Sequence, residues 1–244
     1  MPLRTGILVI GSLFWETDDV RQAWRRHRLR MQEAVDGRAP IRYGRISKGR
    51  GNTYTMVFSR ACALGQAKVV PCRNEVRTAN DLIAEAELLW AAERKGPWKG
   101  RINAGWGCVA LLPNPRREIA PEILESWAAR VARARPYGNI RQAPGEGVLV
   151  SERGLLEIAW PILIADNNPV PLDLLLSTAT QPDLMGDPPR YPTPAMIAER
   201  WRNDREDNVR YFRKNLQSGI RTFEDEVIQT ALAEVTADKN SRSQ

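Results

Sequence analysis

The chain has 244 residues, of which 43% are hydrophobic and 27% are charged, and it contains eight tryptophans. This composition excludes a disordered or fibrous protein and predicts one large folded domain, with or without a smaller appendage. The formal net charge of +7 favours anionic partners, but it does not separate small anions from nucleic acid or a membrane surface.

Three cysteines, Cys62, Cys72 and Cys108, are widely spaced and form no C-x-x-C pair, so the sequence predicts neither a disulfide framework nor a zinc site. The apolar run at the N-terminus is followed by acidic residues and lacks a small-residue cleavage site, so a signal peptide is not expected. No run approaches the roughly 18 apolar residues that a membrane-spanning helix needs. We therefore expect a cytoplasmic protein that does not insert into a membrane.

The first segment with a clear pattern is GILVIGSLFW at residues 6–15. Residues 7–10 are aliphatic and partly β-branched, which predicts a strand that is buried on both faces. Gly11, Ser12 and Leu13 form the turn that ends this strand, and the glycine lets another molecule lie against the backbone. Free N–H groups in such a turn suit a carboxylate or a developing oxyanion, although an ordinary turn without a ligand explains the same residues.

A helix is expected next, with Thr17 as its N-cap and a cluster of basic residues within 21–30 towards its end. The helix dipole alone explains bases near a C-terminus. Few aromatic residues are interleaved with the charges, so nucleic-acid binding is not favoured. His27, in this cluster, is the only histidine, and the sequence therefore predicts neither a catalytic triad nor a metal site.

Three short runs rich in β-branched or aromatic residues, at 41–46, 53–58 and 66–72, predict consecutive strands. Their connections are short, which favours an antiparallel meander or part of a barrel. Residues 48–52, KGRGN, lack the spacing of a phosphate-binding loop and are expected to form a tight hairpin loop.

The clearest helical pattern covers residues 79–95. Thr78 and Asp81 have the spacing of a capping box, and Gly96 marks the end of the helix. At 100° per residue, Glu93 falls in the middle of an apolar stripe. The other members of that stripe are Leu82, Ala86 and Leu89.

Glu93 is the acid of this helix that is expected to point towards the core, whereas Glu85 lies at the edge of the stripe and Glu87 outside it. A buried carboxylate has to be hydrogen-bonded, paired or neutral, and burial raises its pKa, which suits a general acid or base near neutral pH. The alternative is that the helix frays before Glu93. Its carboxylate would then pair at the surface with Arg94, Lys95 or Arg101.

Four segments together resemble a known family. They are ILVIGSLFWE, RISKGRGNTYTMVF, GQAKVVP and DLIAEAELLWAAE, and they extend over about residues 7–94. In order and spacing they resemble the γ-glutamyl cyclotransferase-like family, which has an opening strand ending in Y-G-S-L and a helix closing in a catalytic glutamate. One position departs from that pattern, because Ile10 stands where the family has the tyrosine. The hydroxyl of that tyrosine is missing here, which leaves the substrate, and activity itself, open.

The resemblance implies an α+β fold with a small mixed or antiparallel β-barrel and outer helices. It implies a cofactor-independent enzyme that releases 5-oxoproline and an amine from a small γ-glutamyl amide, or catalyses a related small-amide reaction. Gly11, Ser12 and Leu13 would bind the substrate through their N–H groups, and Glu93 would carry the proton. Neither a metal nor a cofactor is implied.

Beyond residue 94 the pattern predicts further elements but no motif. A strand is expected at 107–112, a helix at 121–134, and strands at 154–164 and 172–178. Glu157 alternates with apolar neighbours in the third of these segments and is the second candidate for a catalytic carboxylate. Residues 139–147 are expected to form an exposed loop.

The expected organisation is a barrel domain at 1–180, a proline-rich connector at 181–194, a helical extension at 195–236 and a disordered tail at 237–244. The extension is expected to consist of two helices, the first beginning after Thr193 with Pro194 at its first position. Its role is either that of an appendage or that of a contact between copies of the chain. The last helix, starting at Thr222 and Asp225, is expected to bury four residues: Phe223, Val227, Ile228 and Leu232.

Two functions therefore remain open on the sequence alone. The first is the γ-glutamyl cyclotransferase-like enzyme, with a small γ-glutamyl or related amide as its partner. The second is a non-catalytic barrel that binds an anionic ligand, nucleic acid or a protein partner through its basic surface.

Overall fold

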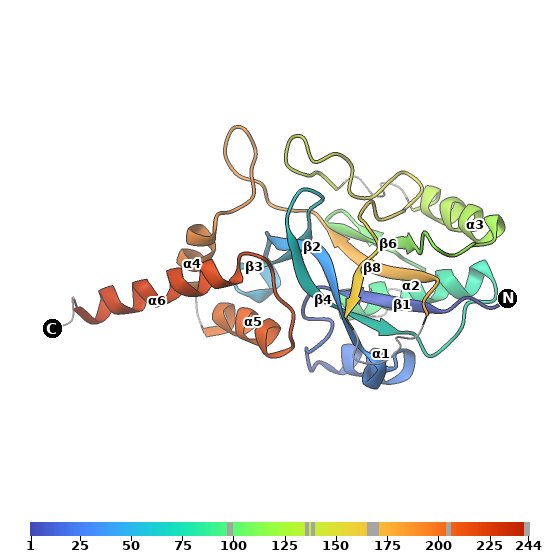
Figure 1. The fold of residues 1–244 in the computed structure, drawn as a ribbon, viewed down its shortest axis with the longest axis horizontal. Helices are drawn as coiled ribbons and strands as arrows, with labels where there is room; N and C mark the ends of the chain where they lie inside the picture. The colour runs from blue at the N-terminus through green and yellow to red at the C-terminus, as the bar shows by residue number, and fades with distance from the viewer. Residues whose placement is uncertain (97–99, 135–136, 138–139, 165–170, 204–205, 242–244) are drawn as a thin grey trace.

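The computed structural model describes residues 1–96, 100–134, 137, 140–164, 171–203 and 206–241, with the backbone alone for 202–203, 206–208 and 234–241. Over these residues the chain has an α+β fold with one eight-stranded mixed sheet and six α-helices (Figure 1). The strands are β1 (Thr5–Val9), β2 (Val35–Ser47), β3 (Thr53–Phe58), β4 (Leu64–Pro71), β5 (Asn103–Ala104), β6 (Gly107–Pro113), β7 (Ile162–Ile164) and β8 (Leu174–Thr180). The helices are α1 (Asp19–Arg28), α2 (Ala79–Arg94), α3 (Pro121–Ala132), α4 (Pro194–Asn203), α5 (Glu206–Gln217) and α6 (Asp225–Ser241).

The opening strand lies in the middle of the sheet. The strand order is β3-β2-β4-β1-β8-β6-β5, with β7 also paired to β2. β1 is antiparallel to β4 and parallel to β8, and all five of its residues are buried. Leu8 packs in one apolar cluster, and Ile7 and Val9 pack in another, as the alternation of side chains along a strand requires. The prediction of a strand buried on both faces is therefore confirmed.

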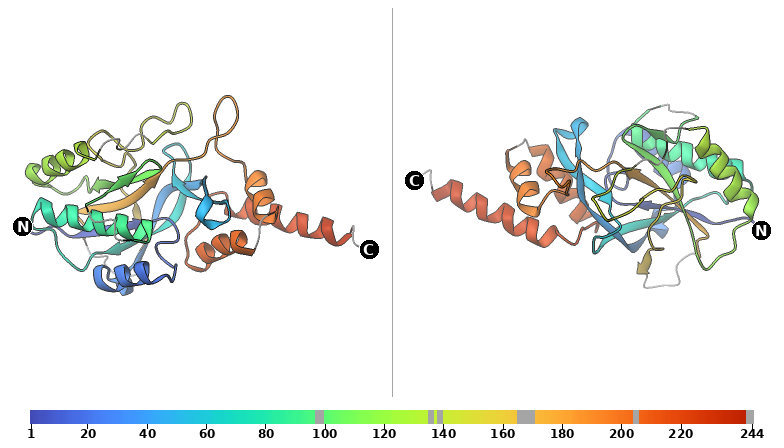
Figure 2. Two further views of the ribbon diagram at one scale, coloured as in Figure 1. Left: turned by 180° about the vertical axis from the view of Figure 1, so that it is seen from behind. Right: turned by 90° about the horizontal axis from the view of Figure 1, so that it is seen from above.

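The sheet of the described residues is open. Its hydrogen-bonded order ends at β3 on one side and at β5 on the other, so the α+β class is confirmed but a closed barrel is not shown. Helices α1, α2 and α3 lie around the half that contains β1, β6 and β8, whereas α4 and α5 pack on β3 at the opposite end (Figures 1 and 2).

The C-terminal helices share the core of the sheet. Trp201 of α4 and Phe212 of α5 are buried and pack on Tyr43 of β2, with ring centroids 4.9 Å and 6.3 Å from the tyrosine ring. Segment 195–236 contains parts of three helices, where two were expected: α4 ends at Asn203 and α5 begins at Glu206. α4 begins at Pro194 as predicted, and the Met196 N–H donates to the Thr193 hydroxyl.

Helix α6 starts at Asp225 as predicted, but the expected burial of two of its neighbours is wrong. Phe223 is 42% exposed and Val227 is 58% exposed, whereas Ile228 is fully buried. Phe223 precedes the helix, and its ring lies against the Arg42 guanidinium. Val227 is the neighbour of Ile228 along the helix, so its side chain does not lie on the face that Ile228 buries in the core. α6 continues to Ser241, so part of the segment expected to be disordered is helical, and residues 242–244 lie outside the described ones.

Several other elements differ from expectation at their ends. The N-cap of α1 is Asp18, whose carboxylate accepts from the Arg21 N–H, and Thr17 lies outside the helix. β2 is much longer than 41–46, because its first half, which has no apolar alternation, pairs with both β4 and β7. Of segment 154–164 only Ile162–Ile164 forms a strand. Within the described residues, none of the helices has both the length and the apolar character that crossing a bilayer requires.

Strand β2 carries a bulge at Gly44. Tyr43 pairs with Met56 and Arg45 pairs with Thr55, so Gly44 is an extra residue on one side. The proline-rich segment is attached at this point, because the Asp183 N–H donates to the Gly44 carbonyl and the Asp183 carboxylate accepts from the Ile46 N–H at 2.6 Å. The bulge thus shifts the alternation of side chains along β2 and sets the face of the strand on which the Arg45 side chain lies.

Candidate active site

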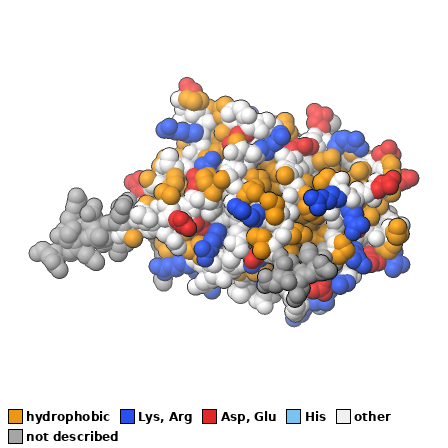
Figure 3. Space-filling view, in the orientation of Figure 1, with side chains coloured by type: hydrophobic (Ala, Val, Ile, Leu, Met, Phe, Trp, Pro, Cys, Tyr) orange, Lys and Arg blue, Asp and Glu red, His pale blue; other side chains and the backbone are white. Residues whose placement is uncertain are grey.

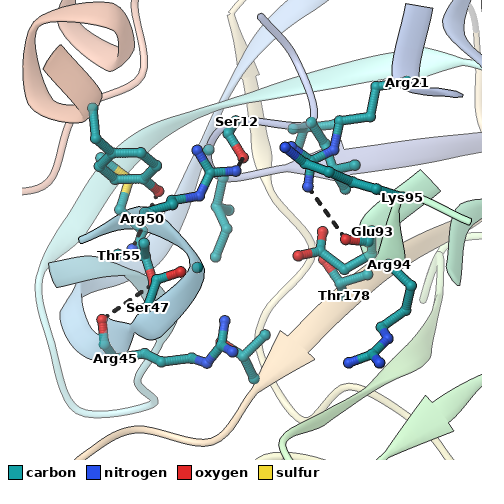
Figure 4. A pocket seen from close by; sticks show the side chains of 18 of the residues that line it. Ser12, Arg21, Arg45, Ser47, Arg50, Thr55, Glu93, Arg94, Lys95 and Thr178 are labelled. Atoms are coloured by element: carbon teal, nitrogen blue, oxygen red, sulfur yellow. Dashed lines mark hydrogen bonds between the residues drawn. The ribbon is translucent and has the colours of Figure 1, made fainter. Parts of the chain in front are cut away.

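A cavity of about 310 Å³ opens where β1 ends (Figure 4). We call it the main cavity. Its walls come from the turn after β1, the end of α2, the β2–β3 hairpin, β8 and α5. The lining residues used below are Gly11, Ser12, Leu13, Arg21, Arg45, Arg50, Glu93, Arg94, Lys95, Trp106 and Tyr211.

The turn at Gly11, Ser12 and Leu13, here called the first turn, is held from outside the cavity. The Phe14 N–H donates to the Gly11 carbonyl at 3.1 Å, and the Arg25 guanidinium donates to the Leu13 carbonyl at 2.7 Å. The backbone N–H groups of the three turn residues donate no hydrogen bond to any described part of the chain. The first turn therefore presents donors of the kind that bind a carboxylate or an oxyanion.

Glu93 lies in the last turn of α2 and lines the same cavity as the first turn. The helix does not fray before it. Lys95 adopts the left-handed conformation that closes the helix, and the capping box of Thr78 and Asp81 is present at the other end. The structure thus brings together the two features that the sequence singled out.

The Glu93 side chain is partly exposed, and its carboxylate faces the open space of the cavity (Figure 4). Among the described residues it accepts no hydrogen bond and has no ion-pair partner, so it does not form the expected alternative pair with Arg94, Lys95 or Arg101. The carboxylate is therefore available to a ligand.

The expectation that Glu93 alone among the acids of α2 points into the core is wrong. Glu85 is only 3% exposed and pairs with Arg28 of α1. Burial raises the pKa of Glu85, and the Arg28 guanidinium opposes that shift. α2 packs against both α1 and α3, which widens its buried face enough to include Glu85. This buried pair lies outside the main cavity.

Arg21 fixes the position of the end of α2. Its side chain is 2% exposed and donates to the carbonyls of Ala92 at 3.1 Å and Glu93 at 3.3 Å. Burial lowers the pKa of Arg21 to about 10, against the charge of Glu93, which raises it. The carbonyls of a last helical turn lack partners within the helix, so Arg21 stabilises the turn that carries Glu93.

Glu16 joins three cations at the edge of the cavity. Its carboxylate pairs with Arg21, with Arg50 and with Lys95, the last at 3.1 Å. Arg50, from the 3-10 turn Lys48–Arg50, also donates to the Ser12 hydroxyl at 2.7 Å. This network connects the first turn, α1 and the β2–β3 hairpin. The Glu16 carboxylate partly neutralises the three cations that it pairs with.

Arg45 differs from those cations. Its guanidinium lies 4.3 Å from the centre of the Trp106 ring, which itself stacks on Trp90 at 5.0 Å. Burial lowers the pKa of Arg45, and the charges of Glu93 and Asp183 oppose that shift. Within the described residues its guanidinium has neither a hydrogen bond nor an ion pair. A partly desolvated guanidinium on an aromatic platform, without an acceptor, is suited to binding an acidic group of a ligand.

Glu157, the second candidate carboxylate, does not reach the main cavity. It lines a separate cavity of about 410 Å³ together with Arg38, Arg60 and Cys62. Burial raises the pKa of the Cys62 thiol to about 11, so this thiol is not an activated nucleophile. No group of three His, Cys, Asp or Glu side chains suited to a metal ion occurs in the part of the chain that the structure describes.

Sequence reasoning did not single out several residues of the main cavity, among them Arg21, Arg45, Trp106 and Tyr211. Arg21 and Arg45 could have been suspected from their positions beside the first turn and in the β-rich segment, but nothing local marks Trp106 or Tyr211.

In chemical terms, the main cavity combines backbone donors, an unpaired carboxylate and an anion-binding guanidinium. Such a set can stabilise an oxyanion and move a proton. No protein-family model matches the chain, and neither a curated protein nor a solved structure gives a significant match.

Proposed function

We propose that the protein is a γ-glutamyl cyclotransferase-like enzyme that releases 5-oxoproline and an amine from a small γ-glutamyl amide. One observation carries the proposal: the free N–H groups of the first turn and the unpaired carboxylate of Glu93 line a single cavity. The small closed barrel that the family resemblance implies is part of the same proposal.

The proposed reaction is an intramolecular ring closure. Glu93 takes a proton from the α-ammonium of the γ-glutamyl group, and the free amine attacks the γ-carbonyl carbon. The first turn donates hydrogen bonds to the oxyanion that forms. Glu93 then returns the proton to the leaving nitrogen, and the old C–N bond breaks as the oxyanion reforms the carbonyl. The new ring nitrogen gives its second proton to the released amine, so 5-oxoproline and an ammonium leave. Orientation in the cavity supplies much of the rate, because both reacting groups belong to one molecule.

The charge of the cavity favours an acidic substrate. Five cationic side chains line it, and Glu93 is the one acid among the lining residues that the structure describes. Arg45 faces Glu93 across the cavity, at a place suited to an acidic group on the leaving amine (Figure 4). We therefore expect an amide such as γ-glutamylalanine to be preferred over the uncharged γ-glutamylethylamide.

The test is an assay for 5-oxoproline with these two amides, using the wild-type protein and Glu93→Gln. Glu93→Gln keeps the shape but cannot accept the proton, so kcat is expected to fall about 10²- to 10⁴-fold. Glu87→Gln is the matched control on the same helix, because Glu87 pairs with Arg130 outside the cavity. The proposal is contradicted if the wild-type protein forms 5-oxoproline from neither amide, or if the wild type and Glu93→Gln form it equally fast.

A second candidate is a non-catalytic protein that binds an anionic ligand in the same cavity, which the five lining cations favour. In the view of Figure 3, basic side chains alternate with acidic and hydrophobic ones, so this face offers no extended basic patch for nucleic acid. The binding function predicts that wild type and Glu93→Gln take up γ-glutamylalanine in calorimetry and that neither forms 5-oxoproline.

A further inference from the structure

Tyr211 reaches the main cavity from α5, a helix 200 residues along the chain from the first turn. Its side chain is 4% exposed. The sequence placed it in an extension without any part in the chemistry, so its contacts with the first turn were not expected.

The hydroxyl of Tyr211 lies directly against Gly11. A Cβ atom built on Gly11 would stand 2.6 Å from the Tyr211 hydroxyl oxygen, closer than real Cβ contacts allow. The φ of Gly11 does not lie in the left-handed region, so the glycine is required by this approach and not by the turn itself. The hydroxyl thus lies against the backbone of Gly11, the first residue of the first turn.

The Tyr211 hydroxyl has a hydrogen to donate. Its oxygen accepts from the Met56 N–H at 3.4 Å, while its own hydrogen has no acceptor among the residues that the structure describes. Burial raises the pKa of Tyr211, and the nearby Arg50 charge opposes that shift. The phenol therefore stays protonated at neutral pH and can act as a donor.

The ring is held in place by residues of the same site. It lies 5.8 Å from the Trp15 ring and 5.5 Å from the Arg50 guanidinium, measured to ring centroids. The Trp15 indole N–H donates at 2.7 Å to the side chain of Asn215, one turn after Tyr211 on α5. These contacts fix α5 against the first turn, so the hydroxyl needs no rearrangement to meet a ligand.

We propose that the Tyr211 hydroxyl is a catalytic hydrogen-bond donor that binds the oxyanion of the substrate together with the first turn. This inference rests on the proposed cyclotransferase function and deepens it. Part of the chemistry is thereby assigned to α5. The Tyr211 hydroxyl comes from a distant helix and lies at a turn where Ile10, in the place of the family's tyrosine, has no hydroxyl.

The first test is Tyr211→Phe, which keeps the ring and its packing. Loss of one oxyanion donor is expected to lower kcat about 10²- to 10³-fold, with KM for γ-glutamylalanine changed less than about threefold. Tyr54→Phe is the control, because its hydroxyl contacts the Met185 sulfur and lies outside the main cavity. A Tyr211→Phe enzyme with unchanged kcat would overturn the inference, and so would a loss confined to KM.

A double mutant separates catalysis from packing. Gly11→Ala brings a methyl group into the hydroxyl, so its Tm is expected to fall, whereas Gly11→Ala with Tyr211→Phe removes the obstacle and should recover most of the Tm. The kcat of the double mutant should remain as low as that of Tyr211→Phe. Recovery of kcat along with Tm would show that Tyr211 acts only through packing.

The two proposals fail in different ways. The wild-type rate of 5-oxoproline release tests the cyclotransferase function, and the ratio of kcat between wild type and Tyr211→Phe tests the role of Tyr211. An active wild type with a ratio near one refutes only the second, whereas an inactive wild type refutes both.

Discussion

Buried acidic side chains also occur outside the main cavity, and each of them has identifiable partners. Glu85 is neutralised by Arg28, and Glu224 pairs with Arg42 at 3.0 Å. Asp225 has no cation at this range among the described residues, and it accepts from the backbone N–H and the hydroxyl of Thr222. Burial is the largest influence on Asp225 and raises its pKa to about 6.

This raised pKa predicts a stability that depends on pH. The folded state binds the proton of Asp225 more tightly than the unfolded state, whose carboxyl has an ordinary pKa near 4. The stabilising contribution is therefore complete below about pH 4 and is lost as the pH rises through about 6. In urea titrations, the wild type should lose up to about 3 kcal/mol between these pH values relative to Asp225→Asn.

Glu85 and Glu224 shift in the same direction, so only the difference between wild type and Asp225→Asn isolates Asp225. Parallel pH profiles for the two proteins would contradict the assignment.

At the scale of elements, α2 is the helix that the sequence predicted best. Its capping box follows from a strong local pattern, and the helix closes at Lys95, one residue before the predicted Gly96. Glu93 lines the cavity, but its side chain is partly exposed and not buried as expected. The burial of Glu85 could not be predicted in this way, because the width of the buried face of α2 depends on the packing of α1 and α3 against it. The first half of β2 was missed for a similar reason, since its partners in β4 and β7 are distant in sequence. The bulge at Gly44 was also missed, although it lies in the pairing of β2 with β3, the next strand along the chain.

The capping box of α2 offers a test of local stability. The Thr78 hydroxyl accepts from the Asp81 N–H, and the Asp81 carboxylate accepts from the Thr78 N–H at 2.8 Å. Thr78→Ala should lower the free energy of unfolding by about 1 kcal/mol in urea titrations. Because the cap lies at the far end of α2 from Glu93, kcat should stay unchanged, and a large loss of kcat would show that the two ends are coupled.

At the scale of the whole molecule, the C-terminal helices belong to the same folded unit as the sheet. Trp201 is fully buried and Phe212 nearly so, in the cluster that also contains Leu8 of β1. The sequence predicted helices here but not their attachment, because helical periodicity shows which face is apolar and not what covers it. The same limit hid Tyr211 from sequence reasoning.

Truncation after residue 193 tests this unity. Removing α4, α5 and α6 exposes Tyr43 and the β3 surface, and deletes the core side chains of Trp201 and Phe212. Loss of one such aromatic costs about 3 to 5 kcal/mol, so losing both is comparable to the total stability of a domain. We expect the truncated chain to show no cooperative thermal transition in circular dichroism, and a transition near the wild-type Tm would show that residues 1–193 fold alone.

The most direct test of the central claim is a crystal structure of Glu93→Gln with bound γ-glutamylalanine. We expect the γ-carbonyl oxygen within hydrogen-bond distance of the first-turn N–H groups, and the α-amino nitrogen beside residue 93. Electron density for the ligand at any other place, or with its γ-carbonyl turned away from Gly11, Ser12 and Leu13, would contradict the account.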